Sequence, residues 1–356
     1  MHRIPVGILG ASGYAGRELC ELVAGHPDLE LRFAAANSRA GETVRVGGDE
    51  LTFVAPDDAP LGEVGLVFSA LPHGASALWV ERAREAGARV VDLSTDFRPG
   101  SGTTGVPYGL PEARPALVAA ASTASSAAAG GVGVDGDSAA VAAPVLMGRE
   151  ALAGATVVAN PGCYPTAILL ALQPLATEGL LLPGATISVA AASGVTGAGM
   201  SPKPELLFGE VTENYRAYGV GNEHRHLLEM REVMRGWGAD ADLLFTPHLL
   251  PVARGILATI TVPLAEPLAD GDDPAALWRD FYAAEPFVEV TGGLPELRDV
   301  QRRNVVRVGV RRAAGLRTPT LIVLAAIDNL TKGAAGQAVQ NANLLLGLPE
   351  TAGLPR

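Results

Sequence analysis

The sequence predicts an α/β protein of two domains: a doubly wound parallel sheet with helices on both faces, and an α+β domain built on a mixed sheet. The N-terminal part alternates short apolar runs, such as 4–9, with helical segments, which is typical of a doubly wound fold. The later runs 257–262, 305–310 and 320–326 are longer and have fewer helices between them. A length of 356 residues also exceeds that of one ordinary domain.

Composition limits the classes of function. Hydrophobic residues make up 48% of the chain, enough for a large core, and the net charge of −11 argues against a general nucleic-acid or anionic-membrane binder. Cys20 and Cys163 are the only cysteines and show no paired spacing, so we expect neither a disulfide framework nor a metal site. No signal peptide precedes the first apolar run, and no run has spanning length. We therefore expect a cytoplasmic protein that binds a small molecule, with no nucleic-acid or membrane partner.

A glycine-rich turn follows the first predicted strand. Gly10, Gly13 and Gly16 lie three residues apart, where a helix over 16–24 is expected to begin. Glycines here let the backbone turn tightly and approach a pyrophosphate at the helix N-terminus, as in dinucleotide-binding domains of the Rossmann type. The alternative is an ordinary strand-to-helix turn, which rarely needs so many glycines. We expect the dinucleotide to contact Gly10, Ser12, Gly13, Tyr14, Ala15 and Gly16.

The end of the second predicted strand, 29–36, indicates which dinucleotide binds. In such sites an acidic residue favours NAD, whereas an arginine accommodates the 2′-phosphate of NADP. The chain reads Asn37-Ser38-Arg39 here, without an acid. We therefore expect NADP, with Ser38 and Arg39 on the 2′-phosphate. The alternative is that Arg39 is a solvated surface residue.

The next two predicted strands end in turns that belong to the same ligand crevice. Leu71 and Pro72 follow the strand 65–70 and are expected against the cofactor. Arg98 follows the strand after it, and its planar guanidinium suits a phosphate or a carboxylate. A surface ion pair between Arg98 and Asp96 is the alternative.

Cys163 is expected at a strand-to-helix turn. An apolar, β-branched run at 157–158 ends in Asn-Pro-Gly at 160–162, and Cys163 follows directly. Because Pro165 suits the first turn of a helix, Cys163 should lie beside free backbone N–H groups and the positive end of the helix dipole. That environment favours the thiolate, which is the nucleophilic form. The alternative is a small, buried core cysteine.

The second predicted domain carries two further candidate contacts. Ser193 and Gly194 follow the predicted strand 185–192 and are expected against the cofactor or the substrate. The triplet His-Arg-His at 224–226 could supply a general acid/base, with Arg225 holding an anionic substrate. A metal site, which no further ligand pattern supports, and a surface triplet are the alternatives.

Two segments complete the predicted organisation. From 118 to 148, Ala, Ser, Gly and Val dominate without periodicity, which indicates a flexible surface insertion, and order is expected to return at Ala151. From Asp328, small residues open a C-terminal helix that we expect to pack back onto the first domain.

Together these features predict one chemistry. A cysteine attacks an activated acyl group to form a thioester, a nicotinamide hydride reduces the thioester to an aldehyde, and a histidine transfers the proton.

Eight motifs lie along the chain between about residues 4 and 350. They are GASGYAG (10–16), ALPHGAS (70–76), VDLSTDFR (91–98), YGLPE (108–112), ANPGCYPT (159–166), HRH (224–226), FTPHLLPVARGILAT (245–259) and DNLTKGAAGQAVQN (328–341). In this set and order the sequence resembles the N-acetyl-γ-glutamyl-phosphate reductase family of the aspartate-semialdehyde dehydrogenase superfamily. The resemblance implies NADPH-dependent reduction of N-acetyl-γ-glutamyl phosphate to N-acetylglutamate 5-semialdehyde, with release of phosphate, in arginine biosynthesis. It also implies a homodimer or homotetramer.

The resemblance also implies residue roles. Cys163 would be the acyl-accepting nucleophile and His224 the acid/base, with His226 as the second choice. Asn329 would lie near the nicotinamide end of the cofactor. One of the two arginines, Arg98 or Arg225, would bind the substrate phosphate and the other its carboxylate, and the resemblance does not decide which. The residues expected to bind substrate are Arg98, Asn160, Arg225 and His226.

The predicted domain boundaries follow from these positions. Residues 1–160 and 329–356 should form the dinucleotide-binding domain, and 161–328 the catalytic, substrate and oligomerisation domain. Three other functions stay open at this point. They are the same chemistry on aspartyl phosphate or a carrier-bound aminoadipyl phosphate, an NADP-binding regulator without catalysis, and a cysteine acyl hydrolase that would leave the glycine turn idle.

Overall fold

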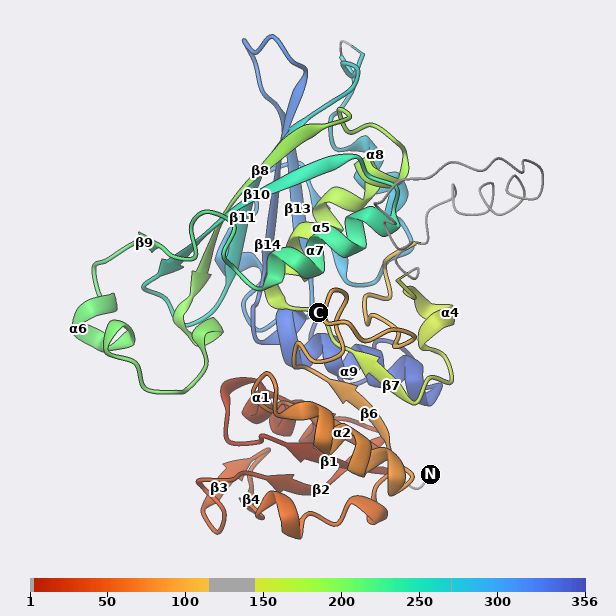
Figure 1. The fold of residues 1–356 in the computed structure, drawn as a ribbon, viewed down its shortest axis with the longest axis vertical. Coiled ribbons are helices and arrows are strands. Elements are labelled where there is room, and N and C mark those ends of the chain that lie inside the picture. Colours follow the sequence, from red (N-terminus) through yellow and green to blue (C-terminus); the bar gives the residue numbers. More distant parts are fainter. Residues whose placement is uncertain (1–2, 115–144, 270) are drawn as a thin grey trace, which may run out of the picture.

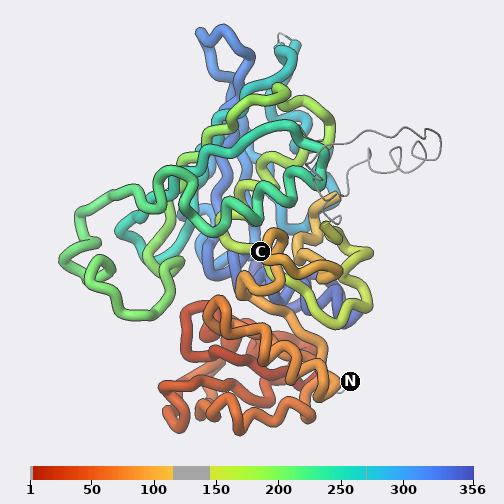
Figure 2. Tube along the Cα trace, in the orientation of Figure 1, coloured from red at the N-terminus to blue at the C-terminus, as the bar shows by residue number. Residues whose placement is uncertain are grey.

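The computed structural model describes residues 3–114, 145–269 and 271–356, so most of the predicted insertion at 118–148 lies outside the described residues. Two sheets organise the chain, one of five strands and one of seven, besides a two-stranded hairpin. In Figure 1 the N-terminal strands occupy one end of an elongated molecule and the longer strands the other, with the C-terminal helix α9 (Gly336–Leu346) between them. The tube in Figure 2 follows the same path and shows the C-terminus near the middle of the molecule.

The five-stranded sheet is parallel throughout and has the strand order β2-β1-β5-β6-β7. Strand β1 has β2 on one side and β5 on the other, so the direction in which strands are added to the sheet reverses between β1 and β5. In folds of this type, ligands bind at the carboxyl ends of the strands at such a point. The elements of this part are β1 (Ile4–Leu9), α1 (Tyr14–Ala24), β2 (Leu29–Ala35), the hairpin β3 (Thr43–Val46) and β4 (Asp49–Thr52), β5 (Leu66–Ser69), α2 (Ser76–Glu85), β6 (Arg89–Asp92), α4 (Arg149–Leu152) and β7 (Val157–Ala159).

Both faces of this sheet are covered, which explains the continuous apolar runs of its strands. Phe68 belongs to the core formed with α1 and α9, whereas the preceding Val67 belongs to the core formed with α2. Successive residues of a strand point to opposite faces, so a run buried on both faces has no polar alternation. The predicted doubly wound sheet is therefore confirmed.

The seven-stranded sheet is mixed and has the order β12-β13-β14-β11-β8-β10-β9. The pairs β8/β10 and β12/β13 are parallel, and the other pairs are antiparallel. Its strands are β8 (Ala185–Gly194), β9 (Arg216–Ala217), β10 (Ala241–Leu250), β11 (Ile256–Pro263), β12 (Val288–Thr291), β13 (Val306–Arg312) and β14 (Thr320–Ile327). The inward residues of these strands form one core with α5 (Cys163–Thr177), α7 (His226–Gly236) and α8 (Ala276–Phe281). The predicted mixed sheet is confirmed.

The chain returns to the first sheet at its C-terminus. A π-helical turn, Thr331–Ala335, leads into α9, and Val339 and Ala342 of α9 share a core with Val6 of β1. The expected packing of the C-terminal helix on the first domain is confirmed. A short helix, α6 (Phe208–Val211), lies in the segment between β8 and β9.

Three predicted boundaries differ from the structure. Helix α1 begins at Tyr14, two residues before the expected start, because Gly13 already serves as its N-cap. Strand β8 continues through Ser193 and Gly194, which were expected in the following loop, because these residues pair with β10 and β11. Secondary structure also begins before Ala151, since Met147 forms an isolated bridge with Tyr108 and α4 begins at Arg149.

Within the described ranges, no helix combines the length and apolar character needed to cross a bilayer.

Candidate active site

The glycine turn after β1 shows why small residues are needed. Gly10 has φ +77°, and a Cβ there would lie 2.4 Å from the Ala70 carbonyl oxygen. A Cβ on Gly16 would lie 2.3 Å from the Gly10 carbonyl oxygen. Both glycines are therefore required by the fold itself.

Gly13 is different, because a Cβ there would meet nothing closer than the Gly10 carbonyl oxygen at 3.5 Å. The protein leaves open space at this position, in front of the first N–H groups of α1, which have no acceptor within the helix. Open space and unpaired donors at a helix N-terminus fit an anionic group such as a pyrophosphate. The turn therefore fits a dinucleotide.

One cavity of about 1120 Å³ brings the predicted site together. It extends from the glycine turn past the ends of β2 and β5 to the start of α5 and α7. All residues expected to bind cofactor or substrate, or to do chemistry, line it: Gly10, Ser12, Gly13, Tyr14, Ala15, Gly16, Ser38, Arg39, Leu71, Pro72, Arg98, Asn160, Cys163, Ser193, Gly194, His224, Arg225, His226 and Asn329. Their grouping is observed, and their individual roles stay predictions.

Arg39 lies at the far end of this cavity and already has an acidic partner. Its Nε is 2.7 Å from an oxygen of Glu42, and its guanidinium lies 5.9 Å from the centre of the Phe53 ring. Glu42 is half exposed, so it can move away if a more strongly charged anion arrives. Arg39 is thus pre-oriented at the cavity wall, although it is also ion-paired at the surface.

Cys163 is the first residue of α5, and Gly162 is its N-cap. The N–H of Thr166 donates to the Gly162 carbonyl oxygen at 2.9 Å, and Pro165 has no N–H. The backbone donors that remain in the first turn are therefore those of Cys163 and Tyr164. The predicted strand-to-helix position of the cysteine is confirmed, and it presents two free donors at the cavity.

The predicted thiolate form of Cys163 is not what the structure favours. Burial raises the pKa of the Cys163 thiol, and this effect outweighs the opposing influence of Arg225, Arg98 and the Tyr164 N–H. The helix N-terminus acts as expected, but the side chain lies in a low-dielectric wall that disfavours charge. In the free protein the nucleophile is therefore held mainly as a thiol.

The two histidines before and at the start of α7 differ in access. His224 is partly exposed in the cavity, and its Nδ1 accepts the N–H of His226 at 3.2 Å. Burial, then the charge of Arg225, lowers the pKa of His224 to about 4. His226 is only 3% exposed, and its Nε2 lies 3.5 Å from Nη1 of Arg98. Both rings are neutral near pH 7, and His224 is the one a ligand can reach.

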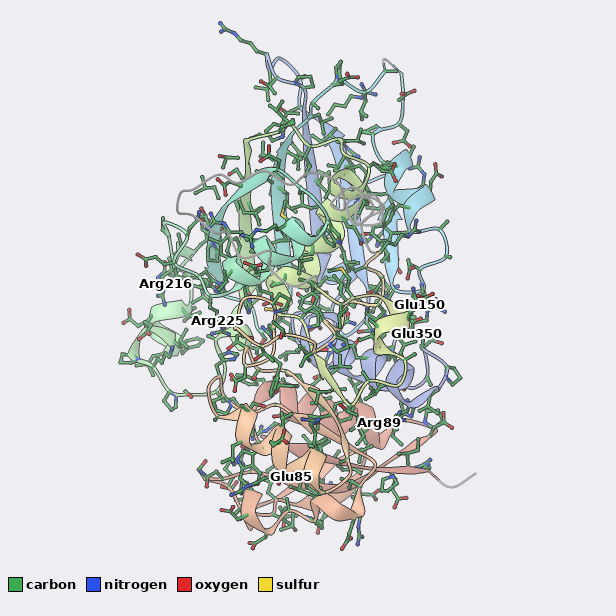
Figure 3. The ribbon with its side chains drawn as sticks, turned by 45° about the vertical axis from the view of Figure 1, so that its right-hand side comes forward. Glu85, Arg89, Glu150, Arg216, Arg225 and Glu350 are labelled. Carbon is green, nitrogen blue, oxygen red and sulfur yellow. The ribbon has the colours of Figure 1, made fainter. Side chains whose placement is uncertain are left out.

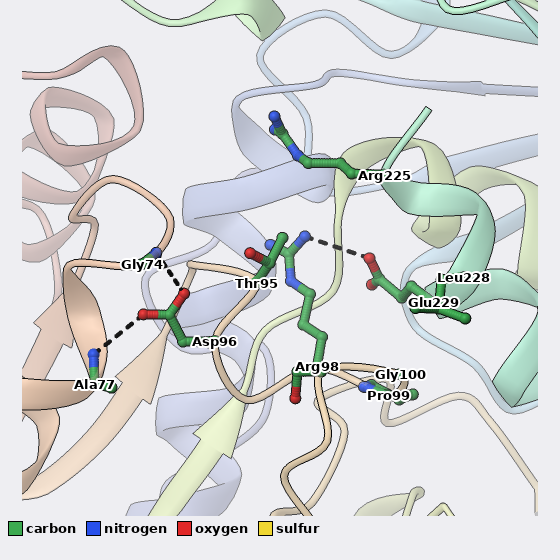
Figure 4. A pocket seen from close by; sticks show the side chains of 11 residues that line it. Gly74, Ala77, Thr95, Asp96, Arg98, Pro99, Gly100, Arg225, Leu228 and Glu229 are labelled. Atoms are coloured by element: carbon green, nitrogen blue, oxygen red, sulfur yellow. Dashed lines mark hydrogen bonds and ion pairs between the residues drawn. The ribbon is translucent and has the colours of Figure 1, made fainter. Parts of the chain in front are cut away.

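Arg98 is buried, and the surface pair with Asp96 considered from the sequence is wrong. Its guanidinium donates to the carbonyl oxygens of Asn160 at 2.8 Å and Leu93 at 2.7 Å. Asp96 instead accepts N–H groups at the start of α2, from Gly74 at 2.7 Å and Ser76 at 3.0 Å, as Figure 4 shows in part. Arg98 therefore holds strand ends together and faces the cavity only with its remaining N–H groups.

Arg225 has no acceptor for its guanidinium among the described residues. It lies at the N-cap of α7 between the main cavity and a smaller one of about 560 Å³, which Thr95, Arg98 and Glu229 also line. In Figure 4 it projects past the Arg98–Glu229 pair, and Figure 3 places it on the same side of the molecule as Arg216. An unpaired guanidinium next to the cysteine is a ready anion site.

The two asparagines of the predicted site have occupied side chains. The Asn160 amide accepts from Asn341 at 2.9 Å and donates to the Ala334 carbonyl oxygen at 3.2 Å. Asn160 is fully buried, and these bonds let its side chain fix the cysteine turn. The direct substrate contact of Asn160 stays a prediction. Asn329 accepts the Gly255 N–H at 2.7 Å and donates to Thr196 at 2.9 Å.

Sequence reasoning missed Glu229 and Tyr108. The Glu229 carboxylate is buried and accepts hydrogen bonds from the Gly162 N–H and the Tyr108 hydroxyl. The signal available was its spacing, because Glu229 follows His226 by three residues on a helix and so shares its face. The residues that contact Glu229, however, lie far from it in the sequence, so the spacing alone does not identify them.

A dinucleotide cleft that also holds a cysteine at a helix N-terminus and a reachable neutral histidine is typical of a nicotinamide-dependent oxidoreductase. Two family models match the chain: the semialdehyde dehydrogenase NAD-binding domain over residues 5–121 and the semialdehyde dehydrogenase dimerisation domain over residues 163–329. The chain belongs to the semialdehyde dehydrogenase family. The first matched range falls within the predicted 1–160, and the second extends one residue beyond the predicted 161–328. The full domain boundaries stay a prediction.

Relatives with curated names narrow the comparison. The N-acetyl-gamma-glutamyl-phosphate reductase of Neisseria gonorrhoeae (strain FA 1090) is 40% identical over 99% of this chain and 97% of its own length. The enzyme of the same name from Halorhodospira halophila is 42% identical over 99% of this chain and 98% of its own. The similarity therefore covers both sheets and the return helix.

Solved structures support the fold. Aspartate semialdehyde dehydrogenase II of Vibrio cholerae, complexed with ASA, has a TM-score of 0.72 at 20% identity, covering 98% of this chain and 99% of its own. Aspartate semialdehyde dehydrogenase with NADP from Candida albicans has a TM-score of 0.65 at 17% identity, covering 97% and 98%. At these identities the likeness concerns the fold alone.

Proposed function

We propose that this chain reduces N-acetyl-γ-glutamyl phosphate to N-acetylglutamate 5-semialdehyde with NADPH, releasing phosphate, as a step of arginine biosynthesis. One observation carries the chemistry: Cys163, at the start of α5, lines the same cavity as the glycine turn of the dinucleotide site. The relatives at 40% and 42% identity, named N-acetyl-gamma-glutamyl-phosphate reductases, support the choice of substrate.

The first step is acyl transfer to sulfur. His224 is neutral because its pKa is lowered to about 4. As the substrate binds, Nδ1 of His224 exchanges its hydrogen bond from the His226 N–H for the thiol proton of Cys163. The sulfur attacks the acyl carbon, the bond from that carbon to the phosphate oxygen breaks, and phosphate leaves. A thioester on Cys163 remains, which splits one difficult reduction into two easier steps.

The negative charge that develops on the acyl oxygen needs donors. The free N–H groups of Cys163 and Tyr164 lie at the start of α5, where the helix dipole also favours negative charge. Arg225, which has no other partner among the described residues, suits the phosphate or the carboxylate of the substrate. Arg98 is held by carbonyl oxygens and contributes its remaining N–H groups.

Reduction follows at the same carbon. When bound, the nicotinamide supplies a hydride to the thioester carbon. Collapse of the resulting carbon–sulfur adduct releases the aldehyde and returns the thiolate, which takes back its proton from His224. We place the nicotinamide end of the cofactor near Asn329, Ser193 and Gly194, and its adenosine end near Ser38 and Arg39.

We further propose that the protein is a homodimer or homotetramer that works in the cytoplasm. Helices α5, α7 and α8 cover one face of the seven-stranded sheet, and the other face carries small or apolar side chains such as Ala190, Leu244 and Thr259. Leu244 is 44% exposed. The matching dimerisation-domain model includes this face, so we place the contact between copies there. Cys163 and Cys20 are both free, which suits a reducing compartment.

The test is the phosphate-dependent reduction of NADP by N-acetylglutamate semialdehyde, measured beside aspartate semialdehyde for the wild type and Cys163→Ser. We expect turnover of the first substrate by the wild type and none by the variant, which should still bind NADP. Equal turnover of both aldehydes would contradict the substrate assignment. Activity that survives in the variant would remove Cys163 from the mechanism.

A further inference from the structure

Glu229 lies where three segments of the chain meet. One carboxylate oxygen accepts the Gly162 N–H at 2.9 Å and the Tyr108 hydroxyl at 2.6 Å. The other oxygen lies 3.3 Å from Nη1 of Arg98, and both side chains of this pair are almost fully buried. Figure 4 shows the pair beside the smaller cavity. A buried carboxylate that accepts this many hydrogen bonds is held in one position, and it holds its donors in place in turn.

Gly162 is the residue through which Glu229 acts. It is the N-cap of α5, so its orientation sets the direction of the Cys163 side chain and of the free N–H groups that follow. A Cβ on Gly162 would lie 2.6 Å from Nε2 of His226 and 2.9 Å from Nη1 of Arg98. Gly162 is therefore enclosed by side chains, and its N–H has the Glu229 carboxylate as its acceptor.

We propose that Glu229 is a positioning residue for the nucleophile. Its carboxylate fixes Gly162, and through Gly162 it fixes the sulfur of Cys163 and the two N–H groups at the start of α5 in the arrangement that acyl transfer requires. This role rests on the proposed function, whereas the contacts themselves do not. Glu229 contacts neither substrate nor cofactor in the proposed mechanism and is therefore not a catalytic residue.

The same carboxylate also acts on Cys163 through its charge. The charged and titratable groups around the sulfur come from several segments. They are Arg98 from the loop after β6, Arg225 at the N-cap of α7, Glu229 of α7, the two histidines at 224 and 226, Tyr164 of α5 and Tyr218 after β9. Glu229 raises the pKa of Cys163, whereas Arg225 and Arg98 lower it. The position of the Glu229 carboxylate therefore favours the reaction of Cys163, whereas its charge disfavours the reactive thiolate. Because the two effects have opposite signs, variants of Glu229 can separate them.

Two variants of Glu229 separate the two effects. Glu229→Asp keeps the charge but shortens the side chain, so kcat should fall on the order of a hundredfold because the reacting groups move by about 1 Å. The alkylation rate of Cys163 by iodoacetamide should not change. Glu229→Gln keeps the size but removes the charge, so alkylation near neutral pH should become severalfold faster while kcat still falls.

Tyr108→Phe is the matched control. It removes one hydrogen bond to Glu229 and keeps the carboxylate and its contact with Gly162, so its kcat should fall less than that of Glu229→Asp, with unchanged alkylation. Alkylation is read from the mass of the peptide that contains Cys163, because Cys20 is a second, buried thiol. Circular dichroism and the melting temperature give the folded fraction of each variant.

Three results decide the proposal. Wild-type kcat per folded molecule in both Glu229 variants would overturn it. If kcat and the alkylation rate of a variant fell only in proportion to its folded fraction, Glu229 would have a merely structural role. That result would also overturn the proposal. A wild-type chain that turns over no acyl phosphate would overturn the proposed function instead, and faster alkylation in Glu229→Gln would still support the link between Glu229 and Cys163.

Discussion

The ammonium nitrogen of Lys332 lies 2.6 Å from a carboxylate oxygen of Glu112, and both side chains are fully buried. Lys332 belongs to the π-helical turn, which also packs Gly333 against Cys163, whereas Glu112 belongs to the loop after β6. Gln340 of α9 contacts both charged groups, accepting from Lys332 at 2.7 Å and donating to Glu112 at 2.9 Å. The pair therefore joins the C-terminal return of the chain to the first sheet.

Breaking this pair from one side should strongly destabilise the protein. Lys332→Met leaves Glu112 as a buried charge without its cation, so we expect the free energy of unfolding to fall by about 3–5 kcal/mol. Urea unfolding followed by circular dichroism measures this loss. Asp57→Asn, which removes the exposed pair with Arg82, is the control and should cost at most about 1 kcal/mol. A Lys332→Met protein as stable as the wild type would contradict the assigned role of the pair.

The choice between the two histidines can be tested directly. His224→Gln should lower kcat on the order of 10²–10⁴-fold, because the group that accepts the Cys163 proton is lost while the fold is kept. His226→Gln should mainly lower the melting temperature, because His226 is buried against Gly162 and Arg98. Steady-state kinetics and thermal unfolding of both variants separate these outcomes. The reverse pattern would assign the proton to His226.

The local features of the site were predictable from the sequence. The strand-to-helix turn at Cys163 and the glycine turn at Gly10 depend on residues within one stretch, so the pattern of glycines, Pro165 and apolar runs was sufficient. The partners that fix these turns were not predictable in the same way. Glu229 contacts Gly162 across 67 residues, and Asn341 contacts Asn160 across 181. Such contacts follow from how the sheets pack, and a single sequence carries no periodic signal for them.

The protonation state of Cys163 was also not predictable from the local sequence. The sequence places the thiol at a positive helix end, which by itself lowers its pKa, but burial depends on tertiary packing and raises it further than the helix lowers it. The π-helical turn after Asp328 is another case, because its sequence reads as an ordinary helix start.

Histidines whose pKa is lowered in the folded chain should make stability depend on pH. The pKa of His224 falls from its ordinary 6.5 to about 4 in the folded chain, and burial lowers the pKa of His226 and His26 as well. Between pH 6.5 and about 4 the unfolded chain therefore binds protons that the folded chain does not. Stability should fall as the pH drops through this window and be fully present above it.

The melting temperature measured from pH 7 to pH 4 checks this dependence. His224→Gln should show a shallower slope than the wild type across the same range, because one of the groups that binds a proton on unfolding is gone. A wild-type melting temperature that stays level down to pH 4 would contradict the assignment of neutral imidazoles to the folded chain.

Assembly through the outward face of the seven-stranded sheet predicts a sensitive position. Leu244→Glu places a charge on that face and should shift the mass measured by light scattering from an oligomer to a monomer. Leu316→Glu is the control, because Leu316 is 58% exposed at the turn between β13 and β14 and should leave the mass unchanged. An oligomer that persists in Leu244→Glu would move the contact to another surface.

The preference for NADPH should depend on Arg39. Its guanidinium lines the cavity beside Ser38 and is held 2.6 Å from Glu42, an acidic partner that a 2′-phosphate would replace. Because a hydrogen bond to a charged group contributes about 1.5–3 kcal/mol, Arg39→Ala should raise the KM for NADPH on the order of tenfold or more, with little change for NADH. Arg32→Ala is the matched control: Arg32, in β2, forms a similar pair with Glu63 but does not line the cavity. Equal effects of the two variants on NADPH would make Arg39 an ordinary surface arginine, and equal effects of Arg39→Ala on NADPH and NADH would remove it from the recognition of the 2′-phosphate.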